Sequence, residues 1–230
     1  MSKLQKSALI VGAVLLIDQI LKIWIKTNMA LGDEFSVIGN WFVIHFVENN
    51  GMAFGFEFGG DYGKIFLSLF RVFAVFGIGY YILKLVKKDI PMGFIACVAL
   101  IFAGAIGNII DSAFYGLIFS DSYGQVATLF PKGGGYATFL HGRVVDMFYF
   151  PIISGVFPDW MPIIGGSDYQ FFRPVFNVAD SAISVGIFAI ILFYRKEFSE
   201  LTSKEHSHEK EETEVANEQV TAPEKESHEI

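Results

Sequence analysis

Four long runs of apolar residues divide the chain. They extend over residues 7–25, 65–86, 92–119 and 174–194. Each can cross a bilayer as a helix, because about 20 apolar residues span a hydrocarbon core of ~30 Å. Hydrophobic residues make up 53% of the 230 residues, too large a share for an ordinary soluble domain. The pattern predicts a membrane protein, mainly α, with four transmembrane helices.

Basic residues at the ends of these runs predict their direction. The seven that flank the runs on one side are Lys3, Lys6, Lys84, Lys87, Lys88, Arg195 and Lys196. They share that side if both termini are cytoplasmic. Lys22 and Lys26 lie at the opposite end of the first run, and we expect their long side chains to snorkel to the interface. Two loops then face outward, over residues 27–64 and 120–173.

The loops and the C-terminal tail differ in composition. Residues 35–58 are rich in β-branched and aromatic residues, which predicts a small β-sheet at the membrane surface. The second loop is long, and long loops are usually functional or mobile. Residues 196–230 hold 11 acidic and 4 basic residues, whereas residues 1–195 hold 13 of each sign. We therefore expect a four-helix domain over residues 1–195 and a disordered, acidic cytoplasmic tail over residues 196–230.

Several classes of site are not indicated by the sequence. Cys97 is the only cysteine, so an intrachain disulfide is impossible. There is no zinc-type cysteine and histidine cluster, no glycine-rich phosphate loop and no basic patch for nucleic acid. We expect no metal, no cofactor and no nucleic-acid partner.

Polar residues inside the apolar runs are the candidates for chemistry, because a carboxylate in hydrocarbon costs roughly 2.5–3.5 kcal/mol. At 1.5 Å per residue, Asp180 lies roughly 9 Å below the outer edge of the fourth run. Asn108 and Asp111 lie roughly 24 and 28 Å above the inner edge of the third, so all three occupy the outer third. Asp18 lies near the middle of the first run, where an ion pair with Lys22 is an alternative to a functional role.

Two further patterns refine this picture. Small residues precede Asp111 at intervals of four, at positions 99, 103 and 107, and small faces let membrane helices pack closely. We therefore expect Asp111 to face protein, where a packing or hydrogen-bonding role is the alternative to a catalytic one. In the fourth run, Asn177, Asp180, Ser181 and Ser184 form a polar stripe.

Asp146, in the second outer loop, is flanked by apolar residues and is expected at the outer membrane boundary with Asp180. Two carboxylates held close in a poorly hydrated site share one proton. One can then activate water while the other protonates the scissile carbonyl, which is the chemistry of aspartic proteases. Neither residue lies in a Ser/His or Cys/His arrangement.

Five motifs in order carry a resemblance to a known family. They are Asp18-Gln19, NNGMAF at 49–54, GAIGNIID at 104–111, GRVVDMFYF at 142–150 and FNVADSAI at 176–183. Over about residues 5–195 the chain resembles the lipoprotein signal peptidases, also called type II signal peptidases. The resemblance implies a multi-pass intramembrane aspartic endopeptidase of the bacterial plasma (inner) membrane, with its active site toward the outer face.

The resemblance also implies the substrate and the residues involved. Such an enzyme removes the signal peptide from diacylglyceryl-modified prolipoproteins by cleaving just before the lipidated cysteine. It needs no cofactor, works among membrane lipids and is blocked by globomycin-type peptides. The implied catalytic pair is Asp146 and Asp180. Residues implied in substrate binding or support are Asp18, Asn49, Gly51, Asn108, Asp111, Arg143 and Asn177. A monomer is expected.

The chain departs from the family pattern in three respects. Ser112 follows Asp111 where the family has an arginine, and Arg143 is a candidate substitute. The segments 112–142 and 147–176 are longer than usual. The acidic tail is an addition, expected to be dispensable for catalysis.

Two other classes of function stay open at this stage. An ion- or proton-coupled transporter predicts internal repeats or broken helices near the membrane midplane, and the sequence indicates neither. A non-catalytic scaffold that binds lipoproteins predicts that Asp→Asn changes leave its role intact. The sequence does not indicate which lipoproteins are preferred or which aspartate holds the shared proton.

Overall fold

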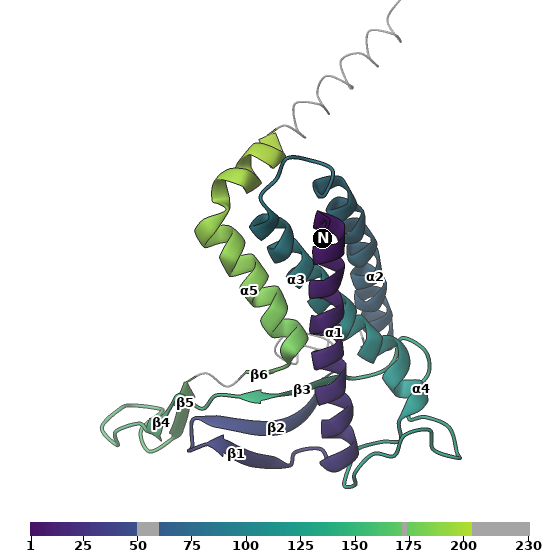
Figure 1. Cartoon of the computed structure of the whole chain (residues 1–230). Coiled ribbons are helices and arrows are strands. Elements are labelled where there is room, and N and C mark those ends of the chain that lie inside the picture. Colours follow the sequence, from purple (N-terminus) through teal and green to yellow (C-terminus); the bar gives the residue numbers. More distant parts are fainter. Residues whose placement is uncertain (50–59, 172–173, 204–230) are drawn as a thin grey trace, which may run out of the picture. The chain divides into compact units, whose positions relative to one another are not determined.

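The computed structural model describes residues 1–49, 60–171 and 174–203 (Figure 1). The chain divides into two compact units, Met1–Ile187 and Phe188–Ile230. The first unit contains all the predicted site residues that are described. Gly51 lies outside the described residues.

Four long helices provide most of the structure. They are α1 (Lys3–Asn28), α2 (Gly60–Leu85), α3 (Met92–Ile110) and α5 (Val178–Phe193). Ser2 begins α1 with a capping box: its hydroxyl accepts from the N–H of Gln5, and the Gln5 side chain accepts from the N–H of Ser2. The helix of α3 continues through the π-helical turn η2 (Asp111–Tyr115) into α4 (Gly116–Ile118). The helices therefore agree with the four predicted runs.

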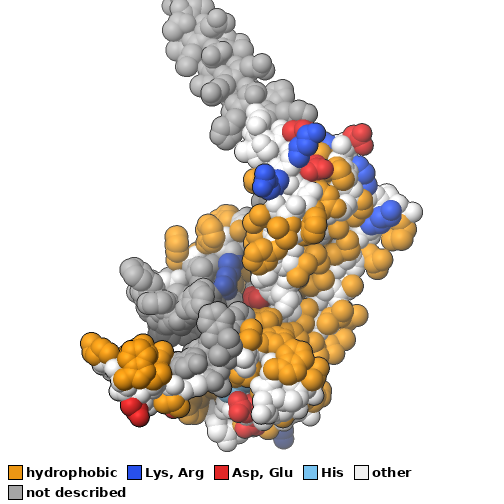
Figure 2. Space-filling model, turned by 90° about the vertical axis from the view of Figure 1, so that its left-hand side faces the viewer, with side chains coloured by type: hydrophobic (Ala, Val, Ile, Leu, Met, Phe, Trp, Pro, Cys, Tyr) orange, Lys and Arg blue, Asp and Glu red, His pale blue; other side chains and the backbone are white. Residues whose placement is uncertain are grey.

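Within the described part of the chain, two helices are long and apolar enough to cross a membrane: Lys3–Asn28 and Met92–Ile118. A third candidate is α5 together with the helix Arg195–Ser203, which are bent by 86°. Large apolar side chains such as Leu16, Ile17 and Phe114 are exposed, and Figure 2 shows hydrophobic side chains covering the helices on one face. The protein thus has the surface of a membrane protein. Four crossings and cytoplasmic termini remain predictions.

A four-stranded antiparallel sheet carries the outer-loop residues. Its strands are β1 (Glu34–Ile38), β2 (Phe42–Asn49), β3 (Val144–Tyr149) and β6 (Val175–Phe176), in the order β1-β2-β3-β6. A separate hairpin pairs β4 (Ile153–Val156) with β5 (Asp168–Phe171). Figure 1 shows the larger sheet beside the C-terminal part of α1. The predicted sheet is confirmed. The second loop supplies β3, and β6 comes from the start of the fourth apolar run.

The strand register brings the sequence motifs together. Val47 of β2 lies opposite Asp146 of β3, and Asn49 lies opposite Val144. Phe148 of β3 lies opposite Phe176 of β6, which leads directly into α5. The sheet therefore joins Asn49, the first residue of the NNGMAF motif, to the GRVVDMFYF and FNVADSAI motifs, although they are far apart along the chain.

A buried core lies between α1, the sheet and the end of the α3–α4 helix. Its residues are Ile25, Met29, Ile44, Phe46, Tyr115, Phe119, Ala127, Val145 and Met147. On α3 the predicted small face is buried, and Asp111 is fully buried with it, so the expectation that Asp111 faces protein is confirmed. A Cβ on Gly104 would lie 2.2 Å from the carbonyl oxygen of Ala179. Only glycine permits so close a backbone approach between α3 and α5.

The start of the last helix differs from the prediction. The apolar run was expected to be helical from residue 174, but residues 175–176 pair with β3 and α5 begins at Val178. Asn177 therefore precedes the helix instead of belonging to a polar stripe along it. Its Oδ1 accepts from the N–H of Asp180 at 2.9 Å, which is the bond of an N-cap.

Candidate active site

Asn177 is the central residue of the site. Its Nδ2 lies 2.7 Å from Oδ1 of Asp146 on β3 and 3.1 Å from Oδ1 of Asn108 on α3. It also lies 3.2 Å from the carbonyl oxygen of Val145. The side chain is fully buried. Because its Oδ1 caps α5 near Asp180, this one amide ties β3, α3 and the start of α5 together.

Asp146 is held by amides from two sides. Oδ1 accepts from Asn177, and Oδ2 accepts from the side-chain amide of Asn49 at the end of β2. Only 2% of the residue is exposed. Strand β3 provides this position, since alternate residues of a strand point to opposite faces. Asp146 was expected in a loop, and the sheet instead gives it a fixed backbone.

Asp180 lies in the first turn of α5. Its Oδ1 accepts from the side-chain amide of Asn108 at 2.7 Å, and the residue is partly buried. A carboxylate here also interacts favourably with the positive end of the helix dipole. The structure thus brings Asp146 and Asp180 to neighbouring positions, each bonded to an asparagine, with those asparagines bonded to each other.

Burial, and then the negative charge of Asp180, raise the pKa of Asp146 to about 8. Asp146 is therefore mostly protonated at neutral pH. A carboxylic acid that keeps its proton at pH 7 can donate a hydrogen bond, which an ionised carboxylate cannot do. A protonated Asp146 is what the predicted chemistry requires of the aspartate that protonates the scissile carbonyl.

A second cluster surrounds Lys22, which is fully buried. Its Nζ lies 2.9 Å from Asp18 and 2.8 Å from Asp111, and donates to Asn108 at 3.1 Å. Gln19 donates to both carboxylates, at 3.1 and 3.0 Å. The ion pair considered for Asp18 is confirmed, and Asp111 shares it. The expectation that Lys22 snorkels is wrong, because buried carboxylates provide its partners.

The two acids of this cluster also reach the backbone beside the aspartate pair. Oδ1 of Asp18 accepts from the N–H of Ala179, directly before Asp180, at 2.9 Å. Oδ2 of Asp111 accepts from the N–H of Val145, directly before Asp146, at 3.2 Å. Asp18 and Asp111 thus each bind the backbone N–H of the residue that precedes one member of the aspartate pair.

Lys26 is also fully buried, so the expectation of snorkelling is wrong here too. Its ammonium is paired with Glu48 of β2 and donates to Ser122 at 2.9 Å. Arg143, the candidate substitute for the family arginine, pairs with Glu48 at 2.9 Å and with Asp121 at 3.2 Å. The structure therefore places Arg143 in an ion cluster with Lys26, Glu48 and Asp121.

Some functional candidates were not found from the sequence. Lys22, Lys26 and Glu48 received no functional role, although Asp18, Lys22 and Lys26 recur at intervals of four, which places three charges on one face of α1. Arg71 of α2 interacts electrostatically with Asp180 and Asp146. Ser112, in the place of the family arginine, donates to the carbonyl oxygen of Asn108 at 3.1 Å.

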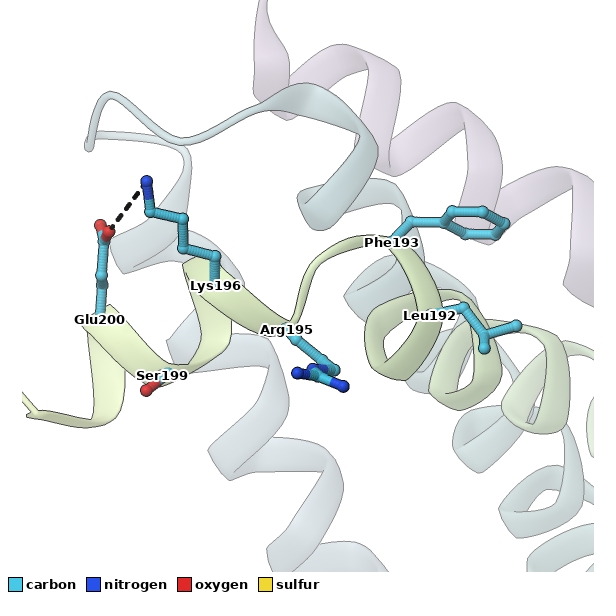
Figure 3. Close-up of a pocket in the computed structure, with 6 residues that line it drawn as sticks. All are labelled: Leu192, Phe193, Arg195, Lys196, Ser199 and Glu200. Atoms are coloured by element: carbon cyan, nitrogen blue, oxygen red, sulfur yellow. Dashed lines mark ion pairs between the residues drawn. The ribbon is translucent and has the colours of Figure 1, made fainter.

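The second unit contains a pocket of about 670 Å³, lined by Leu192, Phe193, Arg195, Lys196, Ser199 and Glu200 (Figure 3). Its carboxylate, Glu200, lies 4.0 Å from Lys196. The lining lacks the pair of carboxylates that the predicted chemistry requires. Among the described residues, no group of three or more His, Cys, Asp or Glu is arranged to hold a metal ion.

Comparison with known proteins identifies the family of the chain. Residues 10–195 match the model of the family described as Signal peptidase (SPase) II. A lipoprotein signal peptidase of Porphyromonas gingivalis is 55% identical over 193 residues, which cover 84% of each chain. One from Amoebophilus asiaticus is 38% identical over 191 residues, covering 82% of this chain and 77% of that protein.

Solved structures show the same relationship. A structure described as a bacterial membrane enzyme superimposes with a TM-score of 0.56 at 26% identity, covering 85% of this chain and 91% of that one. A second, described in the same words, gives a TM-score of 0.54 at 28% identity, covering 84% and 94%. Together with the family match over residues 10–195, these similarities show that the chain belongs to the signal peptidase II family of peptidases.

Proposed function

We propose that this chain is an intramembrane aspartic endopeptidase that removes the signal peptide from diacylglyceryl-modified prolipoproteins, cleaving just before the lipidated cysteine. Asp146 and Asp180 are the catalytic pair. The observation that carries the proposal is the position of Asn177, whose amide bonds both to Asp146 and to the N–H of Asp180. Membership of the signal peptidase II family supports the reaction class.

In the proposed reaction, Asp180 accepts a proton from a water molecule as the water oxygen attacks the scissile carbonyl carbon. Protonated Asp146 donates its proton to the carbonyl oxygen, which gives a gem-diol. One hydroxyl of the gem-diol then returns a proton to Asp146 as the C–N bond breaks. The leaving nitrogen takes the proton from Asp180, and both carboxyl groups return to their starting states. The pair titrates as a unit during such a cycle.

The surrounding groups have supporting roles in this proposal. Asn49, Asn108 and Asn177 orient the carboxyl oxygens of Asp146 and Asp180. Asp18 and Asp111, held by Lys22, fix the backbone beside each member of the pair. Fixed groups of this kind lower the barrier because they need little reorganisation when charge develops.

The proposed setting is the outer face of the bacterial plasma (inner) membrane. Asp180 lies in the first turn of an apolar helix, and Asp146 lies in a sheet beside the end of α1. A diacylglyceryl chain would stay in the bilayer while its peptide enters between helix and sheet. Anchoring the lipid positions the scissile bond, which is worth several kcal/mol of the barrier. A globomycin-type cyclic peptide would compete for the same space, and a monomer suffices for the reaction.

The direct test is cleavage of a synthetic diacylglyceryl prolipoprotein by detergent-purified wild type, Asp146→Asn and Asp180→Asn. Both variants are expected to lose turnover by at least about 10³-fold, because neither can complete the proton cycle. The exposed Asp159→Asn is the matched control and is expected to turn over like wild type. Mass spectrometry of the product locates the cleaved bond.

Two outcomes would contradict the proposal. Turnover that survives in either Asp→Asn variant would remove that residue from the catalytic pair. An inactive wild type that still binds the prolipoprotein would favour the scaffold, and proton flux into liposomes carrying the purified protein would favour the transporter. Circular dichroism of each variant separates loss of chemistry from loss of folding.

A further inference from the structure

Two consecutive residues at the end of β2 point to opposite faces of the sheet. Asn49 donates to Oδ2 of Asp146, on the face of the candidate site. Glu48 contacts Lys26, Ser122 and Arg143 on the other face. Neighbouring side chains alternate across a strand, so the position of Glu48 also determines where Asn49 lies.

Glu48 is enclosed by partners. Oε1 accepts from Lys26 and from the hydroxyl of Ser122 at 3.0 Å, while Oε2 accepts from Arg143 at 2.9 Å. The side chain of Glu48 is 1% exposed and those of Lys26 and Ser122 are not exposed at all. A buried charge needs such a complete set of partners, since an unpaired one is strongly destabilising.

Aromatic rings hold the two cations from the sides. The Lys26 ammonium lies 5.1 Å from the ring centre of Tyr136 and 5.2 Å from that of Phe119. The Arg143 guanidinium lies 4.7 Å from the ring centre of Tyr136. The hydroxyl of Tyr136 in turn accepts from the N–H of Arg143 at 2.7 Å. The cations therefore have little freedom to move.

The cluster connects three elements of the first unit. Lys26 belongs to α1, Glu48 to β2, and Arg143 directly precedes β3, which carries Asp146. In the strand register Glu48 lies opposite Val145, the residue before Asp146. The cluster thus fixes β2 against β3 at the point where Asn49 reaches Asp146.

The charges within the cluster balance, because Lys26 and Arg143 face Glu48 and Asp121. A balanced cluster has a weak field at a distance, so its effect on Asp146 is one of position more than of charge.

We propose that the cluster of Lys26, Glu48, Arg143 and Asp121 is a positioning device for the aspartate pair and that it acts on Asp146 through Asn49. The inference rests on the proposed role of Asp146 in peptide cleavage. Glu48 and Lys26 are positioning residues in this scheme and do not touch the substrate.

The test is a double-mutant cycle in the full-length protein, with Glu48→Gln, Asn49→Ala and the two combined. Glu48→Gln is expected to lower kcat about 10- to 100-fold with KM within about twofold, since small misplacement of catalytic groups has effects of this size. If Glu48 acts through Asn49, the double variant is no slower than Asn49→Ala alone. Glu34→Gln, the same change at an exposed carboxylate of the same sheet, is the control and keeps the wild-type kcat.

Two kinetic outcomes would overturn the inference. One is a double variant whose loss is the product of the two single losses, because independent sites multiply in rate. The other is a Glu48→Gln enzyme that is as fast as Glu34→Gln.

A second variant covers the case in which Glu48→Gln does not fold. Lys26→Met combined with Glu48→Met replaces the pair by apolar side chains of similar length, which buried ion pairs often tolerate. This folded variant is expected to keep the kinetic loss. Wild-type kcat in it would show that any packed side chain suffices and would overturn the inference.

A measurement without turnover separates this inference from the proposed function. The side-chain amide of Asn49, labelled with ¹⁵N and identified by its loss in Asn49→Ala, is expected to shift in Glu48→Gln and to stay in place in Glu34→Gln. An unchanged signal overturns the positioning role even if the enzyme cleaves prolipoprotein. A shifted signal in a protein that does not cleave prolipoprotein would support the link between Glu48 and Asn49 and would contradict the proposed function.

Discussion

The side-chain amide of Asn177 donates a hydrogen bond of 2.7 Å to Oδ1 of Asp146. The oxygen of the same amide accepts from the N–H of Asp180 at 2.9 Å. A single planar group thereby sets the distance between strand β3 and the first turn of α5. Asn177 therefore links the two members of the aspartate pair.

Replacing Asn177 is accordingly expected to impair catalysis more than folding. Asn177→Ala removes a hydrogen bond to Asp146 and the cap of α5. A hydrogen bond between neutral groups contributes ~0.5–1.5 kcal/mol, which corresponds to roughly a 2- to 10-fold lower kcat. Cleavage kinetics on the lipidated substrate measure this. Asn28→Ala removes an exposed asparagine at the end of α1 and serves as the control; equal kcat in the two variants would contradict the assignment.

Lys22 is expected to be essential for stability. Lys22→Met leaves Asp18 and Asp111 buried without their cation, and breaking a buried ion pair from one side destabilises by ~3–5 kcal/mol. Thermal unfolding in detergent measures the loss. Lys196→Met, at an exposed lysine 4.0 Å from Glu200, is the matched control and is expected to change little.

The same experiment has an internal check. Combining Lys22→Met with Asp18→Asn and Asp111→Asn removes the unpaired charges, so part of the lost stability should return. If the triple variant is less stable than Lys22→Met alone, the loss does not arise from unpaired carboxylates.

Close packing of α3 against α5 predicts a strong effect at Gly104. The added Cβ of Gly104→Ala would lie 2.2 Å from the carbonyl oxygen of Ala179 and 2.6 Å from Cγ1 of Ile183, so the two helices must separate. Overpacking of this kind destabilises by ~1–3 kcal/mol. It would also move Asn108 away from Asp180, so turnover and melting temperature are both expected to fall.

Gly12 provides the control for this change. A Cβ at Gly12 meets nothing within 4 Å, so Gly12→Ala within α1 is expected to be neutral or stabilising by up to ~1 kcal/mol. Comparable melting temperatures for the two alanine variants would show that α3 and α5 are not in close contact.

The raised pKa of Asp146 predicts the pH dependence of turnover. With a pKa of about 8, Asp146 holds its proton at pH 7 and loses it above pH 8. The proposed reaction needs that proton, so kcat/KM is expected to decline along an alkaline limb centred near pH 8. Initial rates between pH 6 and pH 10 test this. Rates that stay level up to pH 10 would place the required proton elsewhere.

The same group makes stability depend on pH. The pKa of Asp146 is raised from 3.8 to about 8, so the folded state binds the proton more tightly than the unfolded state does. The stability that this proton provides is present at low pH and is lost as the pH rises from about 4 to about 8. Asparagine does not titrate, so Asp146→Asn does not lose stability in this way as the pH rises. The free energy of unfolding of this variant should therefore exceed that of wild type by more at pH 9 than at pH 6, as measured by chemical unfolding.

The apolar runs and the motif order determined much of this protein from the sequence alone. The helices and the small sheet follow from local pattern, because periodicity and β-branched content depend on nearby residues. The orientation of Asp111 was also predictable, since small residues at intervals of four define the face of α3 that packs against protein. The family resemblance indicated Asp146 and Asp180, and the structure brings both to Asn177.

The partners of the buried charges were decided only by the tertiary structure. Lys22 and Lys26 looked like interfacial lysines, yet Lys22 bonds Asn108, 86 residues away, and Lys26 bonds Ser122, 96 residues away. The sequence predicted that Asn177 belongs to a helix, but β6 pairs with β3 and Asn177 is the cap of α5. Sequence pattern shows which face of an element is polar. Which charge meets that face depends on how distant segments pack, because a buried ion is stable only where the fold brings its counterion.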